Sequence, residues 1–164
     1  MTFEEFAGVR LPALLRYATV LSGDPHLAQD IVQDVLVRVH ARWGKVSRYD
    51  APEQYVRRAI LNAYISWRRR WSVRNLVSFG SPPEQVAPEP VGSEPSELWQ
   101  RLAGLPRRQR AVLALRYYEG FTDAEIAELL GCTTGTVRSH ASKALASLRA
   151  DLGGAHPPTY LEAL

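Results

Sequence analysis

The segment from residue 55 to residue 77 combines six arginines with four aromatic residues and contains no aspartate or glutamate. The arginines are Arg57, Arg58, Arg68, Arg69, Arg70 and Arg74, and the aromatic residues are Tyr55, Tyr64, Trp67 and Trp71. Guanidinium groups neutralise phosphates and aromatic rings stack on exposed bases, so this combination favours binding to single-stranded or locally melted DNA. The alternative is a basic surface whose rings fill a core. That interpretation is preferred for Trp67, on the inward face of a predicted helix, and Trp71 is left undecided.

A second polar cluster falls in residues 122–150, where the spacing predicts a helix-turn-helix. Thr122 and Glu125 form a capping box for a helix over 123–130, Gly131 ends that helix, and Thr133 caps a second one from 134 to about 150. Polar side chains on the second helix can reach base edges or phosphates: Thr136, Arg138, Ser139, His140, Ser142 and Lys143. A solvated face of an ordinary helical hairpin is the alternative. The caps, the glycine turn and the absence of acids from 132 to 150 favour duplex DNA.

The other helices that must position these groups begin at recognisable caps. Capping boxes at residues 2–5 and 50–53 each predict a helix start, the second helix running to about residue 71. Asp24 caps a helix that opens with proline and runs to about residue 43. Pro12 predicts that the first helix kinks or restarts. No alternating strand pattern is found, so we expect an all-α fold.

The middle of the chain differs in composition from both sides. Residues 78–97 hold five prolines and four glutamates but no lysine or arginine, and no helical or strand period is visible. This composition predicts a flexible linker. We therefore expect two small helical domains, at residues 1–77 and 98–152, followed by a tail at 153–164.

Composition and motifs narrow the function further. The formal net charge is +3, Cys132 is the only cysteine, and the four histidines show no spacing that fits a zinc site. Nucleotide-binding glycine motifs and nucleophile motifs are also missing, so we expect no enzyme activity, no cofactor and no metal. The acidic N-terminal segment and the lack of a long apolar run predict a cytoplasmic protein without membrane attachment.

Three segments together resemble a known family. Residues 105–149 resemble region 4 of bacterial sigma factors, residues 26–43 resemble region 2.2, and residues 52–71 resemble regions 2.3 and 2.4. Because only these regions are found, the chain is similar to the extracytoplasmic-function (ECF) group of the sigma-70 family. The resemblance implies a subunit that binds core RNA polymerase, directs it to promoters through −10 and −35 elements, and promotes melting. Many relatives are held inactive by an anti-sigma factor.

The resemblance also implies roles for individual residues. Docking on the clamp helices of the largest polymerase subunit falls to Gln29, Asp30, Gln33, Asp34 and Val37. A solvated helix face explains their periodicity equally well. Asn62 matches the asparagine at the pocket for a flipped −10 base, although a surface asparagine is the simpler interpretation without the resemblance. The remaining −10 contacts are Ser47, Arg48, Tyr49, Arg57, Arg58, Arg68, Arg69 and Arg70. The −35 contacts are Thr136, Arg138, Ser139, Ser142 and Lys143.

Two departures from the family pattern affect the expected promoter sequence. Tyr55 stands where tryptophan is usual, and Ser66 stands where aspartate is common. Two other functions remain open from the residues alone. One is a stand-alone regulator that binds duplex DNA with its helix-turn-helix, and the other is an RNA-binding or adaptor protein that uses the arginines. Reconstitution with core polymerase distinguishes them.

Overall fold

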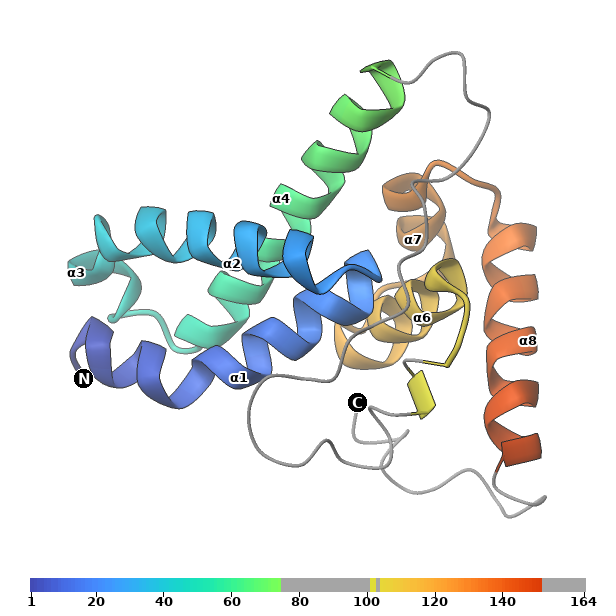
Figure 1. Cartoon of the computed structure of the whole chain (residues 1–164), viewed down its shortest axis with the longest axis horizontal. Coiled ribbons are helices and arrows are strands. Elements are labelled where there is room, and N and C mark those ends of the chain that lie inside the picture. Colours follow the sequence, from blue (N-terminus) through green and yellow to red (C-terminus); the bar gives the residue numbers. More distant parts are fainter. Residues whose placement is uncertain (75–100, 103, 152–164) are drawn as a thin grey trace. The chain divides into compact units, whose positions relative to one another are not determined.

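The computed structural model describes residues 1–74, 101–102 and 104–151, and every regular element in these ranges is helical (Figure 1). The predicted all-α fold is confirmed. The chain divides into two units, Met1–Ser93 and Glu94–Leu164. The predicted linker at 78–97 and tail at 153–164 lie outside the described residues, so both stay predictions.

The first unit contains α1 (Phe3–Ser22), α2 (Pro25–His40), the short α3 (Trp43–Val46) and α4 (Pro52–Arg74). Figure 1 shows α1 and α2 running alongside each other, and α4 packs against both. The buried side chains at their junction are mainly aliphatic: Leu14, Leu21, Val32, Val35, Val56, Ile60 and Leu61. Removing these side chains from water is the main force that holds the three helices together.

Helix α1 begins at the predicted capping box. The Thr2 hydroxyl accepts from the Glu5 backbone N–H at 3.2 Å, and the Thr2 N–H donates to the Glu5 carboxylate at 2.8 Å. The helix continues through Pro12 to Ser22, so the predicted restart is wrong. Packing on α2 and α4 offsets the one backbone hydrogen bond that proline removes.

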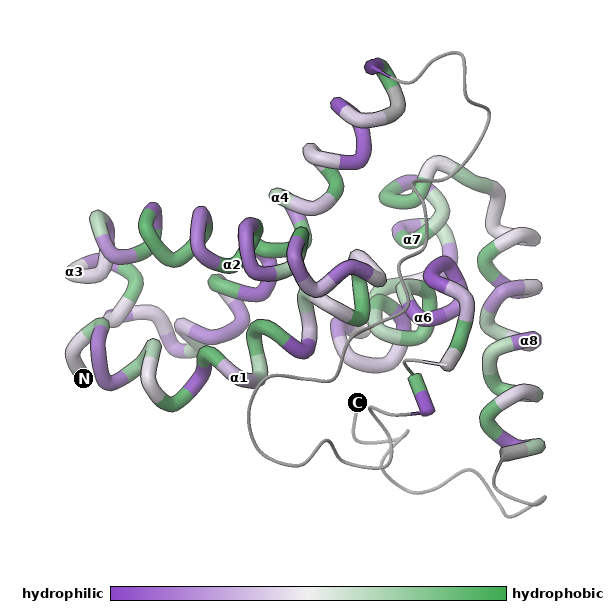
Figure 2. The backbone as a smooth tube through the Cα atoms, in the orientation of Figure 1, coloured by the Kyte–Doolittle hydropathy of each residue, from purple (hydrophilic) through white to green (hydrophobic). Residues whose placement is uncertain are grey.

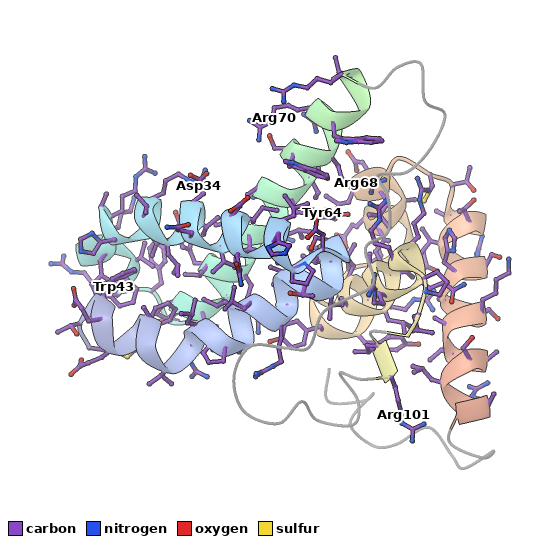
Figure 3. All side chains as sticks on the ribbon, in the orientation of Figure 1. Asp34, Trp43, Tyr64, Arg68, Arg70 and Arg101 are labelled. Carbon is purple, nitrogen blue, oxygen red and sulfur yellow. The ribbon has the colours of Figure 1, made fainter. Side chains whose placement is uncertain are left out.

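Helix α2 opens as predicted but ends earlier. Asp24 accepts from the N–H groups of His26 and Leu27, and Pro25 is the first residue. The predicted end near residue 43 is wrong, because α2 stops at His40. Trp43 begins α3 instead, and its indole N–H donates to the Met1 carbonyl at 3.1 Å (Figure 3). This contact spans 42 positions in sequence, so local periodicity could not indicate it.

The start of α4 differs from the start that the second capping box predicted. The helix begins at Pro52, so Ala51 rather than Asp50 precedes its first residue. The Glu53 carboxylate is paired with Arg10 at 3.1 Å and with Arg57 at 3.6 Å. Glu53 therefore ties α4 to α1 through an ion pair.

The second unit contains α6 (Arg107–Leu113), a π-helical turn η1 (Ala114–Tyr118), α7 (Asp123–Leu130) and α8 (Thr134–Asp151). The helix that begins at Arg107 therefore continues as a π-helix from Ala114. Residues 101 and 102 are also helical. The core gathers Leu102, Leu105, Leu113, Ala144 and Leu148. Figure 2 shows hydrophobic and hydrophilic residues alternating along α8, as expected for a helix with one buried face.

Candidate nucleic-acid and polymerase interface

Most of the arginines of α4 reach the surface. Arg58, Arg69 and Arg70 are exposed, while Arg57 and Arg68 are half-buried. Figure 3 shows Arg70 projecting from the outer part of α4, and Figure 2 shows hydrophilic residues recurring along that part. The α4 segment therefore presents several cationic groups on one helix, which is what contact with a phosphate backbone requires.

The aromatic residues of α4 divide between core and surface. Tyr64 is only 2% exposed, so for this ring the alternative of a core-filling aromatic residue holds. Trp67 is half-buried and stacks on Tyr64, with ring centroids 6.4 Å apart and planes at 15°. This contact agrees with the inward position predicted for Trp67. Trp71 is also half-buried.

The loop that precedes α4 exposes the three residues predicted to read the −10 element. Ser47, Arg48 and Tyr49 are exposed, whereas Val46 is buried and anchors the start of the loop. The rings of Tyr49 and Tyr55 meet edge to face, with centroids 5.3 Å apart. Through this contact the loop and the first turn of α4 form one continuous surface. Tyr55 is 37% exposed, so its ring can contact both Tyr49 and a ligand.

A cavity of about 350 Å³ lies beside this aromatic pair. Its walls are Val35, Arg38, Val39, Ala41, Arg42, Tyr55 and Ala59, from the end of α2 and the start of α4. Asn62, which is exposed, follows Tyr55 by seven residues and so lies two turns along the same face of α4. The sequence reasoning missed Arg38 and Arg42. Arg38 lies in the last turn of α2 and Arg42 in the turn that follows it, and their spacing of four residues was the available signal.

The five residues predicted to dock on polymerase form one exposed surface of α2. All of them are exposed, and Val37 is 66% exposed although it is apolar. Asp34 forms an ion pair with Arg38 at 3.6 Å, and Figure 3 shows it on α2, facing away from α1.

Part of this docking surface is a groove between α1 and α2. Gln29, Gln33 and Val37 line it, and its volume is about 650 Å³. Leu11 and Leu15 supply the α1 side, and Leu11 is 38% exposed. The sequence reasoning found the polar stripe but missed this apolar contribution. Only the packing of α1 on α2 brings the two sides together.

The helix-turn-helix has the predicted geometry. The Thr122 hydroxyl accepts from the Glu125 N–H at 3.2 Å, and the Glu125 carboxylate accepts from the Thr122 N–H at 2.8 Å. Helix α7 covers the predicted residues and ends at Gly131, whose φ of +65° lies in the left-handed region. The Thr133 hydroxyl accepts from the Thr136 N–H at 3.1 Å and caps α8. The capping box, the left-handed Gly131 and the Thr133 cap together set the angle between α7 and α8.

An ion pair that sequence reasoning missed supports the same geometry. Arg116 in η1 donates from Nε and Nη2 to one carboxylate oxygen of Asp123, at 3.1 and 2.5 Å. This hydrogen bond raises the pKa of Arg116 above its usual value. Because Asp123 is the first residue of α7, the pair attaches the helix start to the preceding turn. No local rule of helix capping indicates a partner seven positions upstream.

The predicted reading face of α8 is exposed with one exception. Arg138, Ser139, Ser142 and Lys143 are exposed. Thr136 is half-buried, and its hydroxyl lies 3.0 Å from the hydroxyl of Thr133. The Thr136 side chain therefore takes part in the cap, and four of the five predicted −35 contacts face solvent.

No helix in the described ranges is sufficiently long and hydrophobic to span a bilayer. Across the same part of the chain, no three histidine, cysteine, aspartate or glutamate residues come together in a way that could bind a metal ion.

The helix-turn-helix of the second unit is a motif that many DNA-binding proteins use. Comparison with known families makes the class specific. Residues 9–73 match the sigma-70 region 2 family and residues 96–148 match the sigma-70 region 4 family.

Two sequence relatives and one solved structure support the same family assignment. The chain is 35% identical to the RNA polymerase sigma-E factor of Streptomyces coelicolor, over 93% of this chain and 86% of that protein. It is 33% identical to the ECF RNA polymerase sigma factor SigL of Mycobacterium tuberculosis, over 92% of this chain and 86% of the relative. The sigma factor RpoE of Bartonella quintana, solved in complex with the anti-sigma factor NepR, is similar with a TM-score of 0.59 and 27% identity. That match covers 94% of this chain and 98% of the other. The chain therefore belongs to the sigma-70 family of RNA polymerase sigma factors, in its extracytoplasmic-function group.

Proposed function

We propose that this chain is a promoter-specificity subunit of bacterial RNA polymerase. It binds the core enzyme, directs it to promoters through −10 and −35 elements, and promotes melting of the duplex. The observation that carries the proposal is the order of the two family matches on one chain, each over a unit with a suitable exposed surface. The protein acts in the cytoplasm by binding alone and is not an enzyme.

Docking on core polymerase falls to the exposed surface of α2. Asp30 and Asp34 supply negative charge for the clamp helices of the largest subunit, and complementary charge speeds association and fixes orientation. The groove between α1 and α2 supplies apolar area, with Val37 at its edge. Burial of this apolar area contributes affinity that rim charges alone seldom give.

Recognition of the −10 element falls to α4 and the loop before it. Arg58, Arg69 and Arg70 hold the backbone of the displaced strand. A base that leaves the stack costs a few kcal/mol, which contacts in a pocket must offset. Asn62 can both donate to and accept from a base edge. The loop residues Ser47, Arg48 and Tyr49 complete this surface, with Arg57 and Arg68 behind it.

Recognition of the −35 element falls to α8 in the major groove of duplex DNA. Arg138 and Lys143 contact phosphates or guanine edges, and Ser139 and Ser142 are small enough to allow close approach. Thr136 contributes mainly by holding the first turn of α8 in place.

An anti-sigma factor is the further partner that we propose. The complex of Bartonella quintana RpoE with NepR supports this proposal, because that sigma factor is similar over nearly its whole length. A protein that covers the docking surface of α2 would compete directly with core polymerase.

Reconstitution with purified core polymerase on a promoter library tests the proposed function. Specific transcripts are expected only when the chain is present. Tight, specific duplex binding without any association with core would instead support a stand-alone regulator, and selective RNA binding would support an RNA-binding protein.

A pair of matched variants makes the test specific to the docking surface. Asp30→Lys together with Asp34→Lys should weaken association with core by at least about tenfold, as measured by sedimentation, because they reverse the charge of that surface. Glu128→Lys, which reverses an exposed charge on α7, is the control and should leave core association unchanged. Equal loss of core association in the aspartate variant and in the Glu128→Lys control would refute the assignment of the docking surface to α2.

A further inference from the structure

The cavity between the end of α2 and the start of α4 has no role in the contacts proposed so far. Its volume of about 350 Å³ lies at the lower end of the range for small-molecule sites, which suits a single nucleobase. Val35 and Val39 are 1% and 3% exposed and close its inner end, and the half-buried Ala59 adds a third aliphatic surface. Unstacked bases are held between apolar side chains of this kind, because their faces carry no polar groups.

The mouth of the cavity carries one aromatic ring and two guanidinium groups. Tyr55 meets Tyr49 at 5.3 Å between ring centroids, so the cavity opens beside the loop that we propose reads the −10 element. Arg38 is partly engaged on its own helix, since it pairs with the Asp34 carboxylate at 3.6 Å and donates to the Asp34 carbonyl at 3.3 Å. The exposed Arg42 has no ion pair or side-chain hydrogen bond with any described residue. Its guanidinium is therefore available to a ligand in the cavity.

The polar side chains around the cavity offer donors rather than acceptors. A guanidinium group only donates, the Tyr55 hydroxyl can do both, and the residues that line the cavity include no carboxylate or amide. Guanine presents two acceptors, O6 and N7, that an arginine fork can contact together, whereas adenine and cytosine present amino groups that need an acceptor. The lining therefore favours guanine over adenine and cytosine.

We propose that this cavity is a binding site for one nucleotide, with a preference for guanine, in which Arg42 contacts O6 and N7 of the base and Arg38 contacts the phosphate. Asn62 lies about 10 Å further along α4, which corresponds to about three base spacings in stacked DNA. The cavity and Asn62 therefore take different bases. The site rests on the proposed function where the nucleotide belongs to a displaced promoter strand. A free nucleotide has the same chemistry, and the experiment separates the two sources.

The first measurement uses the full chain and two labelled single-stranded oligonucleotides at low ionic strength. One consists of about ten adenines, and the other carries a single guanine at its centre. Backbone contacts are the same for both, so a difference in fluorescence anisotropy titrations reports the base alone. The oligonucleotide with guanine should bind at least about fivefold more tightly.

Three variants assign the preference to the cavity. Arg42→Gln should abolish or reverse it, because a glutamine amide pairs with N6 and N7 of adenine. Lys45→Gln removes an exposed charge three residues away that does not line the cavity, so it should weaken both oligonucleotides equally and keep the preference. Ala59→Leu fills the interior without changing any charge, so it should abolish the preference and leave binding to the adenine oligonucleotide unchanged. If Arg42→Gln behaved like Lys45→Gln, the site would be refuted.

The second measurement identifies the source of the nucleotide. The methyl resonances of Ala41 and Ala59, which line the cavity, should shift on titration with guanosine monophosphate at a concentration at least about fivefold lower than with adenosine monophosphate. A guanine preference among the oligonucleotides assigns the site to a DNA strand, and one confined to the mononucleotides assigns it to a free nucleotide.

Absence of a guanine preference in both measurements would overturn the site. Core-dependent transcription that persists in that case would show that the proposed function stands without it. A guanine preference in a chain that does not associate with core polymerase would show the opposite.

Discussion

The two units reach a stable helical fold in different ways. In the first, helices of 20, 16 and 23 residues lie against one another along extended apolar stripes. In the second, α7 has only eight residues, and its ends are fixed by a capping box, a left-handed glycine and the ion pair to η1. Isolated helices this short are unstable in water. Contacts at the two ends of α7 must therefore provide part of the stability that longer helices gain from their buried faces. The first unit is therefore stabilised mainly by buried apolar area, and the second depends to a greater extent on individual polar contacts.

The exposed surfaces of the two units also differ in chemical character. The first unit leaves an apolar groove and an exposed valine beside acidic residues, which suits a protein partner. The second unit shows a reading face of arginine, lysine and serine, which suits duplex DNA. A groove tolerates small changes of shape, whereas base reading requires a fixed angle between two helices.

The largest expected effect comes from truncation of the cores. Ile60 and Ile126 are each 0% exposed, one in each unit. Ile60→Ala and Ile126→Ala should each lower the free energy of unfolding by about 2–5 kcal/mol, through lost apolar contact and the cavity left behind. Amide hydrogen exchange should confine each loss to its own unit. Equal loss of protection in both units would show that they are not separately stabilised.

Charge removal tests the proposed division between single strand and duplex. Arg69→Ala with Arg70→Ala should reduce the salt dependence of single-strand binding by about 1.4 in log–log slope, since each contacted phosphate contributes about 0.7. Arg138→Ala with Lys143→Ala should reduce the slope for duplex by about 1.8. Binding to labelled oligonucleotides over a salt series measures both. If each pair weakened both ligands equally, α4 and α8 would not have distinct roles.

The Arg116–Asp123 and Arg38–Asp34 ion pairs should contribute differently to stability because their exposure differs. The side chains of Arg116 and Asp123 are 25% and 28% exposed, whereas those of Arg38 and Asp34 are 61% and 79% exposed. Arg116→Ala should destabilise the second unit by about 1–2 kcal/mol, because it leaves a partly buried carboxylate without its donor. Arg38→Ala should cost less than about 0.5 kcal/mol. Chemical denaturation compares them, and the reverse order would mean that exposure does not set the strength of these pairs.

The smallest expected difference concerns the two capping boxes, which have the same hydrogen-bond lengths. Thr2→Ala and Thr122→Ala should each cost about 1 kcal/mol. The loss should remain in the first turn of α1 but spread over all of α7, because α7 has only about two turns. Residue-resolved amide exchange measures the extent. Equal spreading in α1 and α7 would show that helix length does not decide how far the loss of a cap extends.

Local signals predicted the second unit better than the first. The residues of α7, its box and Gly131 follow from a window of ten positions, so sequence sufficed. The end of α2, which was predicted wrongly, and the burial of Tyr64, which was left open, depend on contacts with distant segments. The exposure of the α2 residues that we propose for docking follows from helical periodicity. The apolar half of the groove, contributed by α1, needed the packed structure, as did the partner of Arg116.

The link from Trp43 to Met1 gives the first unit a natural reporter of opening. The indole lies at the joint of α1, α2 and α3, with its ring centroid 4.9 Å from that of Phe6 and 5.7 Å from that of Phe3. Its N–H loses its acceptor when Met1, which precedes α1, separates from Trp43. Deuterium uptake at this single indole nitrogen would therefore count those separations directly, without any label added to the protein.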